Sequence, residues 1–196
     1  TAKAEYNDNI RLTSAAHDDV WGLILDPGLR LARRSELWDL SANARLRASR
    51  YEGQDGLDTV DNFFGVAAKR RFERGSFDAS ANLANDTTLQ TETIDLDTGL
   101  TIAQIDRSRR DARLAASYMF TESTWVEASV GYSTTKYDDG ERYGLFDYDY
   151  LTPGLRLIHQ LDAKTQVFTV LNHARVDYDR FDELQSKNDS LQIGAS

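Results

Sequence analysis

The sequence predicts an all-β fold: an antiparallel, up-and-down β-barrel that crosses a membrane through its strands. Three observations predict it: apolar and polar residues alternate over long segments, several segments are longer than ordinary strands, and short and long connections follow one another in turn. The chain of 196 residues has no linker-like segment, so residues 1–196 are taken as one domain. We expect about ten strands, at 4–13, 20–33, 37–50, 62–72, 77–87, 109–120, 125–137, 148–161, 166–178 and 190–196.

The alternation is clearest between Trp38 and Ser49. Even-numbered positions there carry Trp, Leu and Ala, whereas odd-numbered positions carry Asp, Ser, Asn and Arg. Successive side chains of a strand point to opposite faces, so this order gives the strand one apolar and one polar face, which a helix could not do. The same pattern returns in 23–31, 77–83, 111–120 and 126–133.

Strand length and connection length both favour a membrane barrel. A tilted strand needs about 9–11 residues to cross a bilayer, whereas strands of soluble proteins average about 5–6. Short turns are predicted at 34–36, 73–76, 121–124 and 162–165, and long loops at 52–61, 87–108, 138–146 and 179–189. Outer-membrane barrels have short periplasmic turns and long outer loops, so we expect the short turns to face the periplasm.

Aromatic residues near the predicted strand ends suit the girdle that such barrels place at the membrane interfaces. The residues expected there are Trp38, Phe72, Phe77, Phe120, Trp125, Tyr137 and Phe168.

Composition excludes several classes of protein. The net charge of -9 argues against a nucleic-acid partner, because neutralising phosphates needs a basic surface. The chain has no cysteine, so it has no disulfide and no thiolate chemistry. The mean hydropathy of -0.55 and the lack of a long apolar run exclude membrane helices, but they permit strands that are apolar on one face only.

Catalytic and metal-binding signatures are absent from the sequence. It contains no nucleophile elbow, no phosphate-binding loop and no zinc-helix motif. The three histidines, His17, His159 and His173, are far apart in sequence and read as ordinary strand or loop residues. We therefore expect a protein that is not an enzyme and that has no cofactor and no metal site.

The charged residues of the polar face are the candidate functional residues. In a barrel they would line a wet lumen, where guanidinium groups bind polar or anionic solutes such as acidic sugars. An alternative is that they only form ion pairs across strands and hold the barrel's shape. The expected lumen residues are Arg30, Arg45, Arg47, Arg71, Arg113, Arg156, Asp39 and Glu127, with Lys69, Arg175 and Asp177 on the same face.

Several short segments resemble a known group of proteins. They are YNDNI at 6–10, DPGLRL at 26–31, DTGL at 97–100, RRD at 109–111, YMFTEST at 118–124 and GLFDY at 144–148. Together they resemble the beta-barrel porin 2 family, which includes outer-membrane proteins associated with exopolysaccharide and exosortase gene clusters. The resemblance implies an outer-membrane barrel of a Gram-negative bacterium, without enzymatic activity, that serves as a conduit or accessory in polysaccharide export. It supplies no catalytic residue.

Two other functions are compatible with the sequence. One is a non-transporting scaffold or adhesin whose acidic loops bind a surface partner, and the other is a soluble carbohydrate-binding β-protein.

The segment at 190–196 lacks the terminal aromatic residue that usually closes such barrels. An open edge is not tolerated in lipid, so we expect further strands or another chain to complete the barrel, with outer-membrane lipids around it.

Overall fold

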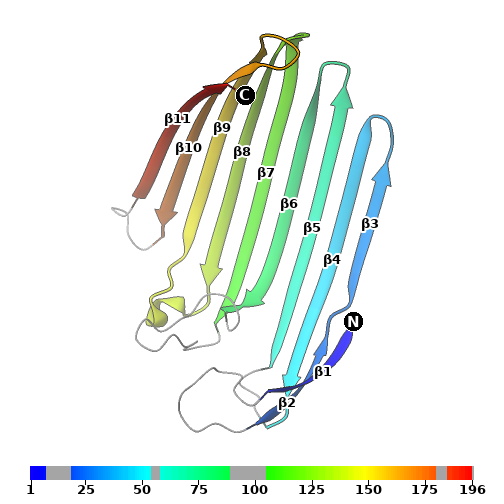
Figure 1. Ribbon diagram of the computed structural model, residues 1–196. Coiled ribbons are helices and arrows are strands. Elements are labelled where there is room, and N and C mark those ends of the chain that lie inside the picture. The colour runs from blue at the N-terminus through cyan, green and yellow to red at the C-terminus, as the bar shows by residue number, and fades with distance from the viewer. Residues whose placement is uncertain (8–18, 54–57, 89–104, 180–184, 196) are drawn as a thin grey trace.

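The computed structural model describes residues 1–7, 19–53, 58–88, 105–179 and 185–195, which form one antiparallel sheet (Figure 1). One short 3₁₀ helix, η3 (Gly140–Tyr143), lies in the connection between two strands. The strands are β1 (Ala2–Asn7), β2 (Val20–Leu25), β3 (Gly28–Arg34), β4 (Trp38–Tyr51), β5 (Thr59–Phe72), β6 (Gly75–Thr87), β7 (Asp106–Thr121), β8 (Thr124–Tyr137), β9 (Tyr148–Gln160), β10 (Gln166–Tyr178) and β11 (Gln185–Ala195).

The strands follow one another across the sheet in sequence order, with one exception. β2 and β3 both pair with β4, so the strand predicted at 20–33 is interrupted between its halves. The break falls at Asp26 and Pro27, since proline has no N–H for the ladder. The Pro27 carbonyl still accepts a hydrogen bond from the N–H of Leu46 at 3.0 Å, which keeps the break against β4.

Two further boundaries differ from the prediction. β11 begins at Gln185 rather than near residue 190, which shortens the preceding loop. β1 begins at Ala2, and the rest of the strand predicted at 4–13 lies outside the described residues after Asn7. Within the loops predicted at 52–61, 87–108 and 179–189, residues 54–57, 89–104 and 180–184 lie outside the described residues.

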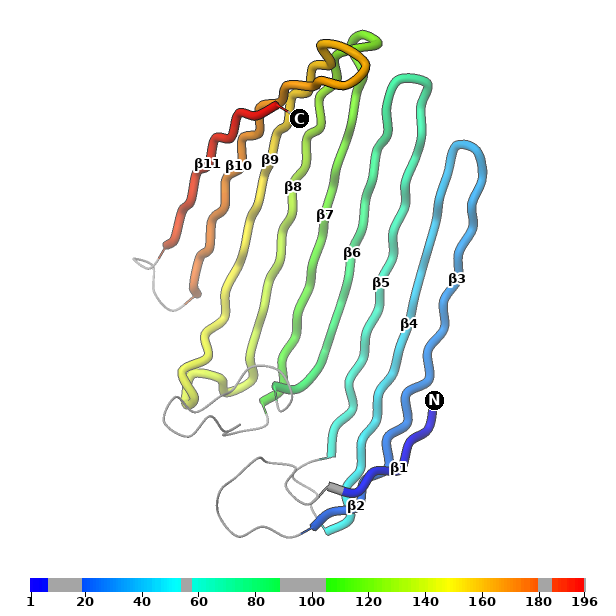
Figure 2. The backbone as a smooth tube through the Cα atoms, viewed as in Figure 1, coloured from blue at the N-terminus to red at the C-terminus, as the bar shows by residue number. Residues whose placement is uncertain are grey.

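The connections sort to the two ends of the sheet (Figure 2). The hairpin turns of β3–β4, β5–β6, β7–β8 and β9–β10 lie at one end, the turn end. The strand ends that lead into the long connections lie at the other end, the loop end, together with η3. Local hydrogen bonds define the tight turns. At the β9–β10 turn, the N–H groups of Lys164 and Thr165 donate to Asp162 Oδ1 at 2.8 and 3.0 Å and lower the pKa of that carboxyl group. The predicted alternation of short and long connections is confirmed.

The sheet has an apolar face and a polar face, as the alternation predicts. Residues paired across neighbouring strands share a face, so the register carries each assignment from strand to strand. One row of the apolar face runs Leu40, Ala68, Ala79, Leu114, Val130 and Pro153 from β4 to β9.

The apolar face is exposed rather than packed into a core. Leu31 is 60% exposed, Val66 57% and Leu114 47%. Few of the described hydrophobic residues are buried: Val20, Ile24, Tyr51, Ala84, Ile105 and Ile158. A soluble protein rarely exposes so broad an apolar surface, and lipid is the environment that would cover it. No helix in the described ranges is long and apolar enough to cross a membrane.

The aromatic residues divide between the two faces, which corrects the expected girdle. Trp38, Phe72, Phe77 and Phe120 lie on the apolar face near the turn end, in agreement with the prediction. Trp125 and Phe168 instead share the polar face with Ile158, and Tyr137 shares it with Arg107. These three point away from the apolar face, because their positions have the parity of the polar residues on their own strands.

A pair of alanines on β7 tests the two faces. Ala112 lies on the apolar face opposite Ala81, and Ala115 lies on the polar face opposite Asp78. We expect Ala112→Arg to destabilise the folded barrel in lipid by about 2–4 kcal/mol, as arginine does near the midplane of a barrel's lipid face. Ala115→Arg should cost much less, since its guanidinium would stay on the polar face, opposite Asp78. Urea unfolding in liposomes measures both, and equal costs would contradict the assignment of the faces.

The orientation of the sheet can be tested by cysteine labelling of intact cells. We expect Ser123→Cys, in the β7–β8 turn, to be protected in the periplasm and Arg142→Cys, in η3, to react with an impermeant reagent. Gly140, at the start of η3, is unsuited to labelling, since a Cβ there would lie 2.5 Å from the Cβ of Tyr137. Labelling at Ser123→Cys alone would reverse the orientation.

Candidate functional site on the polar face

All eight predicted lumen residues lie on the polar face. Asp39 is paired with Lys69, Lys69 with Asp78, and Glu127 with Arg156, and the same register places the others. Arg175 and Asp177 do not: they are paired with Leu151 and Asp149 and lie on the apolar face near the loop end. The prediction for these two residues is wrong. β10 has apolar residues at both odd and even positions, so its sequence does not show which positions lie on the polar face.

Three of the predicted arginines are held by carboxylates. Arg45 binds Asp26 through two guanidinium nitrogens, and Arg71 binds Asp39. Asp39 also accepts a hydrogen bond from Arg34 Nε at 3.2 Å. The third, Arg156, has its Nη1 3.6 Å from Glu127 Oε2 and its guanidinium over the ring of Phe168 at 5.3 Å. For these three the ion-pair interpretation describes the structure.

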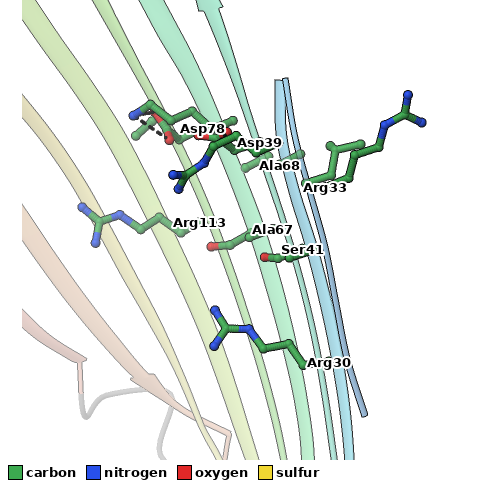
Figure 3. Close-up of a pocket in the computed structure, with 15 residues that line it drawn as sticks. Arg30, Arg33, Asp39, Ser41, Ala67, Ala68, Asp78 and Arg113 are labelled. Atoms are coloured by element: carbon green, nitrogen blue, oxygen red, sulfur yellow. Dashed lines mark hydrogen bonds and ion pairs between the residues drawn. The ribbon is translucent and has the colours of Figure 1, made fainter. Parts of the chain in front are cut away.

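Arg30 and Arg113 are different, because neither has an ion-pair partner among the described residues. Arg30 is opposite Asn43 on β4, and Arg113 is opposite Ser80 on β6 and Gly131 on β8. Both guanidinium groups project from the same side of the sheet, with Asp39, and into the same space (Figure 3). Arg47 also lacks an ion pair within the described ranges, and lies opposite Asp61 on β5.

The space between Arg30 and Arg113 is a hollow of about 620 Å³. Its floor consists of small side chains, because the facing positions on β4, β5 and β6 are Ser41, Ala67 and Ser80. Toward the turn end the hollow is bounded by paired charges. Lys69 Nζ lies 3.1 Å from Asp78 Oδ1, and Ser76 Oγ donates to Asp78 Oδ2 at 3.3 Å.

Two asparagines flank a glycine next to this floor. Gly65 lies between Asn43 on β4 and Asn82 on β6, in the row of Arg30. A Cβ at Gly65 would lie 2.5 Å from Asn43 Oδ1 and 2.8 Å from Asn82 Oδ1, so only glycine leaves room for both amides. The amide groups offer donors and acceptors beside the two free guanidinium groups.

A second hollow, of about 430 Å³, continues the polar face toward β10. It shares Lys69, Asp78 and Arg113 with the first and adds Glu127 and Arg156. Arg113 therefore lines both hollows, which together span the polar face from β3 to β10.

Sequence reasoning found the face but missed the asparagine pair and the glycine between them. The available signal was Gly65 in the interior of a long strand, which often marks a close approach of neighbouring groups. His17 lies outside the described residues, and the two described histidines, His159 and His173, each have a different partner. His159 Nδ1 is 2.8 Å from Thr124 Oγ1, whereas His173 pairs with Asp189. Within the described residues no cluster of acidic and histidine side chains could hold a metal ion.

Comparisons with known proteins identify the fold. No protein-family model and no curated protein matches the chain. The structure is similar to the outer membrane channel DcaP of Acinetobacter baumannii, with a TM-score of 0.62 and 10% identity over 99% of this chain and 61% of that one. The fold is that of an outer-membrane β-barrel.

Two structures of OmpT of Vibrio cholerae, an outer membrane protein, agree with this conclusion. Their TM-scores are 0.52 and 0.56, their identities 11% and 10%, and the matches cover 90% and 96% of this chain and 60% and 66% of theirs. This chain spans less than two thirds of the length of each of these three structures. The predicted fold class and the bacterial outer membrane as its place are thus confirmed, while the beta-barrel porin 2 family and the lack of enzymatic activity stay predictions.

Two ion pairs of the polar face should differ in their contribution to stability. Arg107 binds Asp86 through two nitrogens at 2.9 and 2.6 Å, with side chains only 3% and 11% exposed. Arg71 and Asp39 are 42% and 23% exposed. We expect Asp86→Asn to destabilise the barrel by up to about 3–5 kcal/mol, because it takes a charged partner from a buried guanidinium. Asp39→Asn should cost less than about 1 kcal/mol. Urea unfolding of both variants compares them, and similar costs would show that burial does not set the difference.

Proposed function

We propose that the chain forms part of the wall of a porin-like channel in the bacterial outer membrane and that its polar face favours anionic solutes. The observation that carries the proposal is the hollow between Arg30 and Arg113. Its two guanidinium groups lie above a floor of small residues and have no ion-pair partner among the described residues. Rings of arginine or lysine in a wet pore favour anions.

The charge around the hollow supports this selectivity. The charged polar-face residues that line it are the cations Arg30, Arg34, Lys69 and Arg113 and the anions Asp39 and Asp78. Asp39 and Asp78 are each bound by a neighbouring cation, so the uncompensated charge of the hollow is positive.

The chemistry of the hollow suits an acidic saccharide. A guanidinium group binds a carboxylate or sulfate through paired hydrogen bonds, and asparagine amides bind hydroxyl groups. Asn43 and Asn82 lie in the row of Arg30, so both kinds of contact are available to one sugar ring or its neighbour. A role as a conduit or accessory in exopolysaccharide export agrees with this chemistry and with the sequence resemblance.

The selectivity is tested by replacing Arg30 and Arg113, the polar-face arginines of the hollow with no ion-pair partner among the described residues, in the full-length protein. In a planar bilayer with a salt gradient, we expect Arg30→Ser with Arg113→Ser to shift the reversal potential toward cation preference. Arg33→Ser is the matched control, since it removes an arginine from the same strand but from the opposite face. Asp39→Asn should act in the other direction and increase the preference for anions, because it leaves Arg34 and Arg71 without their shared carboxylate.

Two outcomes would contradict the proposal. A conducting channel whose ion preference is unchanged by the double substitution would leave Arg30 and Arg113 without a role in selectivity. A folded full-length barrel that does not conduct at all would favour the scaffold or adhesin instead. The soluble carbohydrate-binding protein is disfavoured by the exposed apolar face of the sheet.

A further inference from the structure

The apolar face carries a groove of its own, on the other side of the sheet from the hollow. It extends from β3 to β7 and has a volume of about 690 Å³. Its floor is made of alanines on adjacent strands, and larger aliphatic residues border it. The floor contains Ala42, Ala68, Ala79, Ala81 and Ala112, and the borders include Leu31, Leu40, Val66 and Leu114.

Two cations lie at the turn end of this groove. Arg33 lines it on β3, opposite Leu40. Arg70 is one row nearer the turn end on β5, and its guanidinium stacks on Trp38 at 5.3 Å and on Phe72 at 5.0 Å. Figure 3 shows Arg33 projecting from the opposite side of the sheet to Arg30 and Arg113.

Neither cation has an ion-pair partner in the part of the chain that the structure describes. A charge on a lipid-facing surface is expensive unless it reaches the interface and is compensated there. The aromatic rings beside Arg70 place this pair at the interfacial level, where tryptophan and other aromatic residues gather.

The lipid itself can supply the missing charge. In outer-membrane barrels the short turns face the periplasm, so Arg33 and Arg70 lie at the level of the phosphates of the periplasmic leaflet. Basic pockets beside an apolar surface bind anionic headgroups. The groove crosses four strand spacings of about 4.8 Å, so it is roughly 19 Å long across the strands. An acyl chain can lie against small side chains along this length.

We propose that this groove binds an anionic phospholipid of the periplasmic leaflet, with the phosphate between Arg33 and Arg70 and an acyl chain along the alanine floor. The inference rests on the fold and its apolar face and does not depend on transport through the polar face. A second copy of the chain is a poorer occupant: a two-fold contact here would bring the same two cations of both copies together.

Native mass spectrometry of the full-length protein tests the proposal. The protein is released from micelles that contain equal amounts of phosphatidylglycerol and phosphatidylcholine with identical acyl chains. We expect the wild type to retain phosphatidylglycerol preferentially. Arg33→Gln with Arg70→Gln should lower the retention of phosphatidylglycerol about 30-fold. Each basic residue at an anionic lipid surface contributes roughly fivefold in affinity, and the two contributions multiply. Ala79→Phe, which fills the floor, should lower retention of both lipids.

The controls separate the groove from general charge effects and from misfolding. Arg30→Gln removes an arginine of the same strand from the polar face and should leave retention unchanged. Arg33→Lys with Arg70→Lys keeps both charges and should restore most of the binding, and heat-modifiable migration in gels shows which variants are folded. Equal retention of the two lipids by the wild type, or unchanged retention in the folded double glutamine variant, would overturn the proposal. A dimer that Ala79→Phe abolishes, without bound lipid, would overturn it in favour of a second copy.

Discussion

The pairing of backbone N–H and C=O groups between neighbouring strands is the constraint on which the rest of the structure depends. In lipid these groups have no water to bind, so each strand must be satisfied along its length by its neighbours. The long, in-register ladders from β4 to β10 meet this requirement. Once the register is fixed, so is the face of every side chain, because a slip by one residue would exchange the two faces.

The two faces then manage charge by different means. On the polar face most cations are held by carboxylates on neighbouring strands, and only a few, Arg30 and Arg113 among them, keep their charge available to solute. On the apolar face Arg70 is stacked on aromatic rings instead of being paired. Arginine thus has three roles, which depend on its register position and its depth in the membrane. It forms ion pairs between strands, it leaves a charge available to solute in the hollow, and it lies at the membrane interface.

Much of the fold and part of the site follow from the sequence. Where one face is strictly apolar, as from Trp38 to Ala48, period-two alternation assigns both faces of the strand correctly. It fails on β10, where Val170 and Leu171 are adjacent and only the pairing with β9 decides which one faces inward. The partner of each arginine is also set between strands, so composition along one strand could not distinguish bound Arg71 from free Arg113.

The sequence-ordered hairpins have a consequence for how the sheet assembles. Nearly every strand pairs with the strand before it and the strand after it in the chain, and the tight turns close the hairpins over two to five residues. Closing such short loops costs little chain entropy, and topologies rich in local contacts fold faster than those built from distant pairings. The interruption at Asp26 and Pro27 respects this order, since both halves use the same neighbour, β4. Each hairpin can therefore pair with the edge of a sheet that has already formed, so the sheet can grow from the N-terminal strands to the C-terminal strands.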